Sequence, residues 1–215
     1  MPKLETISLD RFQVTPFKRA IRTKRDVIAI WMHALKAFLI GENFVEEQDR
    51  VGSLTISISA MSRLFCETEQ GKKSYSVGFP FKLKDEDGER IFLSRGNYLL
   101  NSKTTSEILA LIADNNALDR PDFYTFVEAV EEITADDENA WGLLRELMLA
   151  EDGYIRYDWD VDRKDGNMHP EHHFDVCYSS EATYKVGLST AATRDVFIDM
   201  LDLETDCHFL TPAPK

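Results

Sequence analysis

The sequence predicts an α+β fold, because its hydrophobic pattern switches between two periods along the chain. Alternation of apolar and polar residues, which indicates strands with one buried face, occupies two regions. Around and between them, apolar residues recur at steps of three or four, which indicates amphipathic helices. The strand-like stretches follow one another through short turns, and this predicts antiparallel meanders.

The N-terminal half predicts one helix packed on an antiparallel β meander. Residues 1–14 are expected to be extended. Thr15 and Pro16 offer a capping residue followed by proline, so a helix is predicted from Phe17 to about Ile40. Strands are then predicted at Ser53–Ser59, Ser74–Lys84 and Glu89–Leu93, with an edge or bulge at Pro80 and a hairpin turn at Asp85–Gly88.

The first two turns of this predicted helix are rich in cations, which oppose the helix macrodipole at that end. A compensating partner is therefore expected. The favoured one is the protein's own acidic half, and the alternatives are another subunit or a phosphate. The candidate binding residues are Lys18, Arg19, Arg22 and Arg25.

Three amphipathic helices are predicted in the middle of the chain, and a three-stranded β meander plus a helix after them. The helices lack glycine-rich loops, which favours a scaffold or an interface over a nucleotide site. Without a linker or repeat, residues 1–215 are expected to form a single α+β domain, with sub-halves 1–100 and 101–215. The helices are expected at Lys103–Asn115, Asp119–Ile133, Trp141–Gly153 and Thr193–Leu203, and the strands at Tyr154–Asp162, Glu171–Ser179 and Thr183–Leu188.

Composition limits the classes of protein to which the chain belongs. Its 215 residues are 43% hydrophobic, enough for a sizeable core, and no apolar run is long enough to span a membrane. The net charge of −13 disfavours direct, non-specific binding of nucleic acid. Cys66, Cys177 and Cys207 lack metal-binding spacing, so reduced thiols and a cytoplasmic location are expected.

The predicted strand Tyr154–Asp162 carries its charges on alternate positions. Arg156, Asp158, Asp160 and Asp162 share one face, and Ile155, Tyr157, Trp159 and Val161 share the other. A row of carboxylates suits a hard cation, but it is also typical of a solvated strand face. The apolar face is expected to be core, and the favoured interpretation of the other face is solvent exposure.

The following stretch, His169-Pro170-Glu171-His172-His173-Phe174-Asp175, concentrates the histidines. In a strand, His173 and Asp175 share one face and His172 and Phe174 the other, so His173 and Asp175 are expected opposite the aspartate row. Such a set suits a divalent metal and an activated water; the alternative is a structural histidine bonded to a carboxylate. Candidate catalytic residues are Asp158, Asp160, His173 and Asp175, and candidate metal ligands are His169, His172 and His173.

The succession in Gly153–Tyr178 resembles the bacterial family called domain of unknown function 2290. The matching residues are Tyr154-Ile155-Arg156-Tyr157-Asp158, then an aspartate-bearing turn, then His169-Pro170-Glu171-His172-His173 before a hydrophobic strand. Lys185 stands where the family pattern has an arginine, and Ala191–Thr193 lacks the family's proline. The resemblance implies a setting in bacterial defence or mobile elements and no particular mechanism.

Two functions are therefore expected. The first is a non-enzymatic accessory or regulatory subunit of a bacterial antiphage defence-type or toxin–antitoxin-like system, which contacts a protein partner encoded nearby or a second copy of itself. The alternative is a metal-dependent nuclease or phosphoesterase with a His/Asp site. One geometric observation separates them. Convergence of the Asp158 and Asp175 carboxylates and a ring nitrogen of His173 within a few Å in a cleft favours the enzyme, whereas Asp158 and Asp160 that splay into solvent disfavour it.

Overall fold

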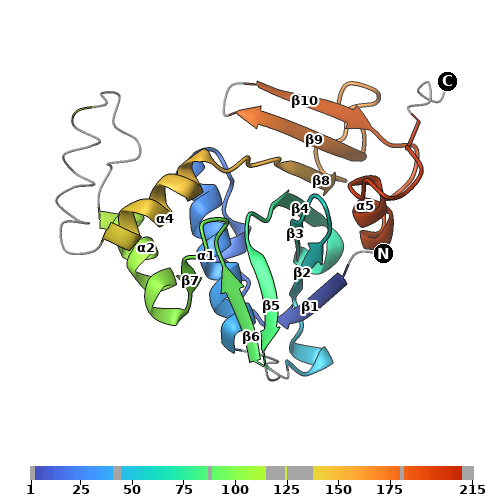
Figure 1. The fold of residues 1–215 in the computed structure, drawn as a ribbon. Coiled ribbons are helices and arrows are strands. Elements are labelled where there is room, and N and C mark those ends of the chain that lie inside the picture. Colours follow the sequence, from blue (N-terminus) through green and yellow to red (C-terminus); the bar gives the residue numbers. More distant parts are fainter. Residues whose placement is uncertain are drawn as a thin grey trace. The chain divides into compact units, whose positions relative to one another are not determined.

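The computed structural model describes residues 3–40, 45–86, 89–114, 124, 138–179 and 182–209 (Figure 1). It is an α+β protein with antiparallel sheets, as the sequence predicts. The chain divides into two compact units, each assembled from separate segments. Unit 1 comprises Met1–Lys18, Phe44–Phe79 and Gly153–Lys215, and unit 2 comprises Arg19–Asn43 and Pro80–Asp152. The expected single domain stays a prediction.

Unit 1 is built on a seven-stranded antiparallel sheet. The C-terminal meander expected from the sequence joins the first part of the N-terminal one in this sheet, because β4 pairs with β8, whereas the strand predicted at Glu89–Leu93 belongs to a separate sheet. The extended N-terminal segment forms its edge strand, β1. In spatial order the strands are β1 (Lys3–Leu9), β2 (Gly52–Ile58), β3 (Arg63–Thr68), β4 (Lys73–Gly78), β8 (Ile155–Trp159), β9 (His172–Ser179) and β10 (Ala182–Gly187).

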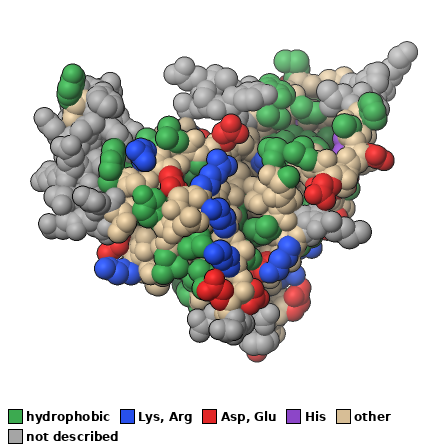
Figure 2. All heavy atoms as spheres, viewed as in Figure 1, with side chains coloured by type: hydrophobic (Ala, Val, Ile, Leu, Met, Phe, Trp, Pro, Cys, Tyr) green, Lys and Arg blue, Asp and Glu red, His purple; other side chains and the backbone are tan. Residues whose placement is uncertain are grey.

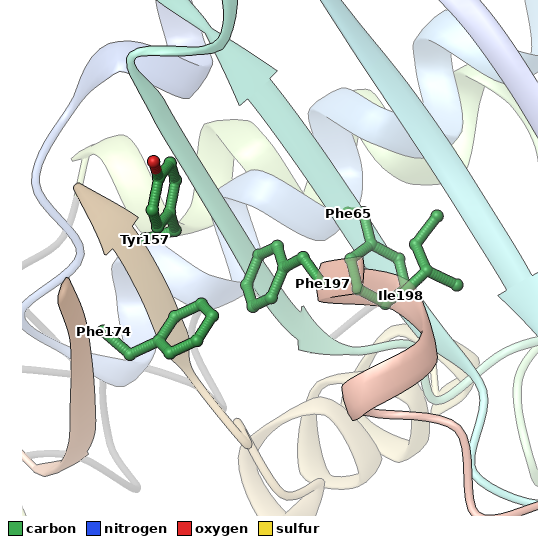
Figure 3. Packing of buried hydrophobic residues seen from close by; sticks show 5 residues of the cluster. All are labelled: Phe65, Tyr157, Phe174, Phe197 and Ile198. Atoms are coloured by element: carbon green, nitrogen blue, oxygen red, sulfur yellow. The ribbon is translucent and has the colours of Figure 1, made fainter. Parts of the chain in front are cut away.

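Helix α5 (Arg194–Met200) covers one face of this sheet. Thr193 caps it, since the Thr193 hydroxyl accepts a hydrogen bond from the backbone N–H of Val196 at 3.3 Å. Phe197 packs against the rings of Phe65 and Phe174, with centroids 5.6 and 5.3 Å apart. Figure 3 shows the rings of Phe65 on β3, Phe174 on β9 and Phe197 on α5 side by side, with Tyr157 on β8 next to them. The buried cluster consists of Phe65, Tyr157, Phe174, Phe197 and Ile198.

Unit 2 consists of helices and a small antiparallel sheet. Helix α1 (Lys24–Ile40) contacts α2 (Ser102–Asp114) and α4 (Glu138–Leu149). The sheet consists of β5 (Lys82–Glu86), β6 (Glu89–Leu93) and β7 (Leu99–Leu100). Trp31 and Phe38 are buried in α1 and meet Phe81 and Phe92 at centroid distances of 6.0 and 6.4 Å. Among the described residues, no helix has the length and apolarity that a membrane span requires.

The first helix begins at Lys24, so the predicted start at Phe17 is wrong. Thr15–Lys18 form a 3-10 turn (η1). The helix begins later because the carboxylate of Asp26 accepts hydrogen bonds from the backbone N–H groups of Arg22 and Thr23, while Thr23 Oγ1 accepts one from the N–H of Asp26. Most of the cations therefore precede the helix, and an acidic residue stands in its first turn.

The favoured intramolecular partner for the cations is seen at Lys24, whose ammonium contacts the carbonyl of Ala150 and the carboxylate of Asp152. The side chains of Lys18, Arg19 and Arg22 are exposed, and that of Arg25 is half-buried. The binding role of these four residues stays a prediction. On the face in Figure 2, Lys and Arg side chains form a short row bordered by Asp and Glu, and hardly any histidine reaches the surface.

Other boundaries also differ from the predicted ones, among them α4, predicted at Trp141–Gly153, and β8, predicted at Tyr154–Asp162. The single strand expected at Ser74–Lys84 is wrong: it divides at Pro80 into β4 and β5, which belong to different sheets, because proline has no N–H to donate to a ladder. Arg63–Thr68 forms β3, where no strand was predicted, and short 3-10 turns lie before β2 at η2 (Glu47–Asp49) and after β3 at η3 (Glu69–Gly71). Apart from Tyr124, the helix predicted at Asp119–Ile133 lies outside the described residues.

Candidate functional site

The register of β8 and β9 brings the predicted site residues together. Asp158 stands directly opposite His173, and Arg156 stands opposite Asp175. Directly paired residues of an antiparallel ladder point to the same face, so these four side chains share one side of the sheet. His173 Nε2 lies 3.7 Å from Asp158 Oδ2 and 3.9 Å from Asp175 Oδ1. The three groups therefore converge within a few Å, which is the distance part of the criterion that favours the enzyme.

Asp158 is buried together with His173 and Asp175, which corrects the favoured interpretation of a solvated face at that position, whereas Asp162 is exposed as that interpretation expects. Asp158, His173 and Asp175 are 4%, 0% and 5% exposed. Two residues expected on the core face, Trp159 and Val161, are instead 41% and 46% exposed. Trp159 is the last residue of β8 and stays on the predicted side, where its ring lies 5.8 Å from that of His172, whereas Val161 follows the strand and alternation no longer orients it.

Arg156 neutralises both carboxylates from within the same strand pair. Its Nε donates to Asp158 Oδ2 at 2.9 Å, and its Nη2 lies 2.7 Å from that oxygen and 2.5 Å from Asp175 Oδ2. Burial lowers the pKa of the guanidinium, but the charges of Asp158 and Asp175 act the other way, and the net effect raises it. Arg156 is therefore a fixed positive charge beside the cluster.

Lys185 on β10 supplies the second positive charge. It stands opposite Asp175 in the β9–β10 ladder. Its Nζ lies 3.0 Å from Asp175 Oδ1 and 3.1 Å from His173 Nε2. With two carboxylates, one guanidinium, one ammonium and a neutral imidazole, the cluster has a formal charge of zero. Such neutralisation is what allows charged groups to be buried.

The hydrogen bonds of His173 fix its tautomer. Its Nδ1 lies 2.9 Å from the carbonyl oxygen of Pro170. A carbonyl only accepts, so Nδ1 carries the proton. An ammonium only donates, so Nε2, which lies 3.1 Å from Lys185 Nζ, carries the lone pair. That lone pair faces the two aspartates and accepts from Lys185. A neutral imidazole whose distal N–H is bonded to a backbone carbonyl has the arrangement usual for a histidine that ligates a metal.

The carboxylate of Asp158 has an unused oxygen. The Asp158 side chain is only 5% exposed, so water does not reach it freely, and its Oδ1 has no hydrogen-bond partner within the protein. An unsatisfied buried oxygen of this kind is costly, and a bound cation or water would satisfy it. One ligand atom from each of Asp158, His173 and Asp175 lies within 4.8 Å of the others. The donor set of two carboxylates and one imidazole suits a divalent cation.

The other sequence candidates lie beside this cluster or on the opposite face. Asp160 follows β8, where it binds the backbone and guanidinium of Arg163, and its Oδ2 is 3.5 Å from His169 Nε2. The His169 ring meets that of His173 edge-on at 4.8 Å between centroids. His172 points to the apolar face, where its Nδ1 lies 2.8 Å from the hydroxyl of Tyr157. Of the three histidines, only His173 joins the two aspartates.

The environment of Cys66 does not suit a nucleophile. Cys66 and Cys207 are free thiols; Cys66 is buried and Cys207 exposed. Burial raises the pKa of the Cys66 thiol to about 12, so it is protonated at neutral pH. Cys66 stands opposite Tyr75, which stands opposite Arg156. This face of the sheet therefore passes from inert groups at β3 to the charged cluster at β8–β10.

The roles of Arg156 and Lys185 were not apparent from the sequence. Arg156 looked like one member of an alternating charged row, and Lys185 lies ten residues beyond Asp175. The β9–β10 register, which shifts between Ala182 and Thr183, decides which face Lys185 occupies. The sequence does place opposite charges on consecutive predicted strands. Whether those charges face each other depends on how the strands are paired, and the sequence does not give that register.

Comparisons with protein-family models, with curated proteins and with solved structures found no match to this chain. The resemblance of Gly153–Tyr178 to the domain of unknown function 2290 stays a prediction.

Proposed function

We propose that this chain is a divalent-metal-dependent phosphoesterase, with Asp158, His173 and Asp175 as the metal ligands. One observation carries the proposal. The lone pair of a buried, neutral histidine and two buried carboxylates converge on one point, and one carboxylate oxygen there has no donor. Groups that are expensive to bury and that converge in this way are characteristic of functional sites.

The spacing of the ligand atoms fits a cation after a small adjustment. Two ligands of one ion, with bonds of about 2.1 Å, lie roughly 3.0 to 3.4 Å apart in octahedral or tetrahedral geometry. The observed separations from His173 Nε2 are 3.7 and 3.9 Å. All three ligand atoms lie within 4.8 Å of one another, so side-chain shifts on the order of 1 Å would close the set, and rotation of two short aspartate side chains can supply them.

The surrounding charges favour an anionic substrate. The cluster of Asp158, His173, Asp175, Arg156 and Lys185 is formally neutral, so a divalent ion makes it locally positive despite the chain's overall charge of −13. A bound divalent ion supplies an acidified water and polarises a phosphoryl oxygen. Arg156 and Lys185, with side chains 33% and 39% exposed, can face the phosphate. These properties together favour phosphate-ester hydrolysis.

The test of the site is calorimetric titration of the protein with MnCl₂, and separately with MgCl₂ and ZnCl₂. The wild-type chain is expected to bind one ion. His173→Gln is expected to weaken binding at least tenfold, because the Nε2 ligand is lost. His172→Gln is the matched control, since it changes the adjacent histidine on the opposite face. Absence of binding to the wild-type chain at millimolar metal would contradict the proposal.

The test of the reaction is hydrolysis of bis(4-nitrophenyl) phosphate with and without Mn²⁺. Release of nitrophenolate is expected to require the metal, to fall at least a hundredfold in Asp158→Asn, and to persist in His172→Gln. Binding of the metal without hydrolysis of any phosphodiester or phosphomonoester probe would leave the metal centre in place and remove the assigned reaction.

A second candidate function is the accessory subunit expected from the sequence. The observation that favours it is a group of exposed apolar side chains in and next to the β8–β9 connection, namely Trp159, Val161 and Met168. Exposed apolar groups that gather in one segment are a common feature of protein-binding surfaces. Co-purification with products of neighbouring genes tests it. Trp159→Ser with Met168→Ser is expected to abolish capture of the partner, and elution of the wild-type chain as an isolated monomer contradicts it.

A further inference from the structure

Lys185 stands where its ammonium contacts two of the three proposed metal ligands. Its Nζ is 3.0 Å from Asp175 Oδ1 and 3.1 Å from His173 Nε2. We propose that Lys185 is an internal cation that holds the ligand set when no metal is bound and is displaced when the metal enters, so that it sets the metal affinity of the site. This inference rests on the proposed metal centre at Asp158, His173 and Asp175.

A metal ion and the Lys185 ammonium would compete for the same lone pairs, on His173 Nε2 and Asp175 Oδ1. His173 Nε2 has a single lone pair, which accepts from Lys185 in this structure and which a metal ion would need as a ligand. Asp175 Oδ1 is shared in the same way. Two positive charges at hydrogen-bond distance from the same atoms also repel each other strongly where water is excluded. Metal binding therefore requires Lys185 to leave.

Arg156 can stay while Lys185 leaves, because the two cations use different oxygens. Arg156 bonds to Oδ2 of Asp158 and Oδ2 of Asp175. Lys185 contacts Oδ1 of Asp175, and Oδ1 of Asp158 has no donor. The guanidinium thus orients both carboxylates through their Oδ2 atoms. The exchangeable cation takes Oδ1 of Asp175, and Asp158 offers either its Oδ1, which has no donor, or the remaining lone pair of Oδ2, which lies 3.7 Å from His173 Nε2.

Lys185 has room to move. Its side chain is 39% exposed, and β10 is the last strand in the order of the sheet. The position opposite His173 on β10 is Gly187, so a side chain from that position does not confine the site. A flexible four-carbon side chain with one exposed end can swing into solvent at small cost, unlike the forked, doubly bonded guanidinium of Arg156.

Lys185→Met tests the inference, because it keeps the aliphatic length and removes the charge. Mn²⁺ is expected to bind Lys185→Met about tenfold more tightly than the wild type in calorimetric titration. Lys185→Arg is expected to bind no more tightly than the wild type. Lys164→Met is the matched control: it removes one charge from a lysine that pairs with Glu171 at 2.9 Å, and its affinity is expected to stay within twofold of wild type.

The outcomes separate this inference from the proposed function. Equal or weaker binding by Lys185→Met, with a wild-type chain that binds Mn²⁺, overturns the internal cation and leaves the metal centre standing. No binding by any variant overturns both. A measurement on the unmodified chain covers the case in which the variant does not fold. Acetic anhydride labelling of Lys185, read by mass spectrometry, is expected to rise several-fold on adding Mn²⁺ while Lys164 stays constant; unchanged labelling of Lys185 overturns the inference.

Discussion

The two faces of the β8–β9 pair are both buried but differ in chemistry. On one face Tyr157 and Phe174 pack beneath Phe197. On the other, Asp158 and Asp175 surround His173. Because side chains alternate along a strand, adjacent residues of the same two strands supply both faces, and a register slip of one residue would exchange them. The comparison shows that one pair of strands can supply both part of the core and a cluster of buried charged groups.

The energetics of the two faces also differ. Burial of a large apolar side chain contributes about 1.5 to 3 kcal/mol each, with no requirement for a specific partner. A buried ion pair contributes close to nothing net, because desolvation offsets attraction, yet removal of one partner is costly. We therefore expect the aromatic face to stabilise the fold and the charged face to depend on its internal neutrality.

Phe197→Ala is expected to show the largest effect, since it removes the ring that contacts Phe65 and Phe174. The expected loss is about 3 to 5 kcal/mol in the free energy of unfolding, from lost burial and the cavity left behind. Urea denaturation followed by circular dichroism measures it. Phe197→Leu, which keeps most of the volume, is the control and is expected to cost less than half as much. A loss below about 1 kcal/mol for the alanine variant would show that α5 does not anchor this face.

Arg156→Met is the corresponding change on the charged face. It leaves Asp158 and Asp175 buried with Lys185 as the remaining cation. The expected cost is about 2 to 3 kcal/mol, below the upper range for a buried pair because the Arg156 side chain is one-third exposed. The double variant Arg156→Met/Asp158→Asn is expected to recover at least about 1 kcal/mol, since one unpaired charge is removed. Additive losses in urea denaturation would contradict the assigned coupling.

This comparison explains which features the sequence could predict. Alternation placed His173 and Asp175 on one face and His172 and Phe174 on the other, and the structure confirms that assignment. The α+β class and the C-terminal meander of β8, β9 and β10 followed from periodicity in the same way. Periodicity is a local property, so it needs no knowledge of distant contacts.

Features that depend on non-local pairing could not be predicted. Alternation alone does not decide which face of β8 is covered, so Asp158 was expected in solvent although it is buried. The pairing of β4 with β8 joins residues about eighty positions apart, and no local pattern encodes it. The helix start at Lys24 was missed because proline after threonine at 15–16 is a strong signal, whereas the Thr23–Asp26 capping bonds compete with it.

Thr193→Ala is expected to show the smallest effect and to sharpen the comparison most. It removes the hydroxyl that caps α5 at Val196, for an expected loss of about 0.5 to 1 kcal/mol; Thr193→Ser keeps the acceptor and is the control. Because α5 packs on the aromatic face alone, Mn²⁺ affinity measured by calorimetry should be unchanged in Thr193→Ala. A weaker affinity would mean that loosening one face of β8–β9 disturbs the ligands on the other. The two faces would then be mechanically coupled through the shared backbone, and the division between a stabilising face and a chemical face would no longer hold.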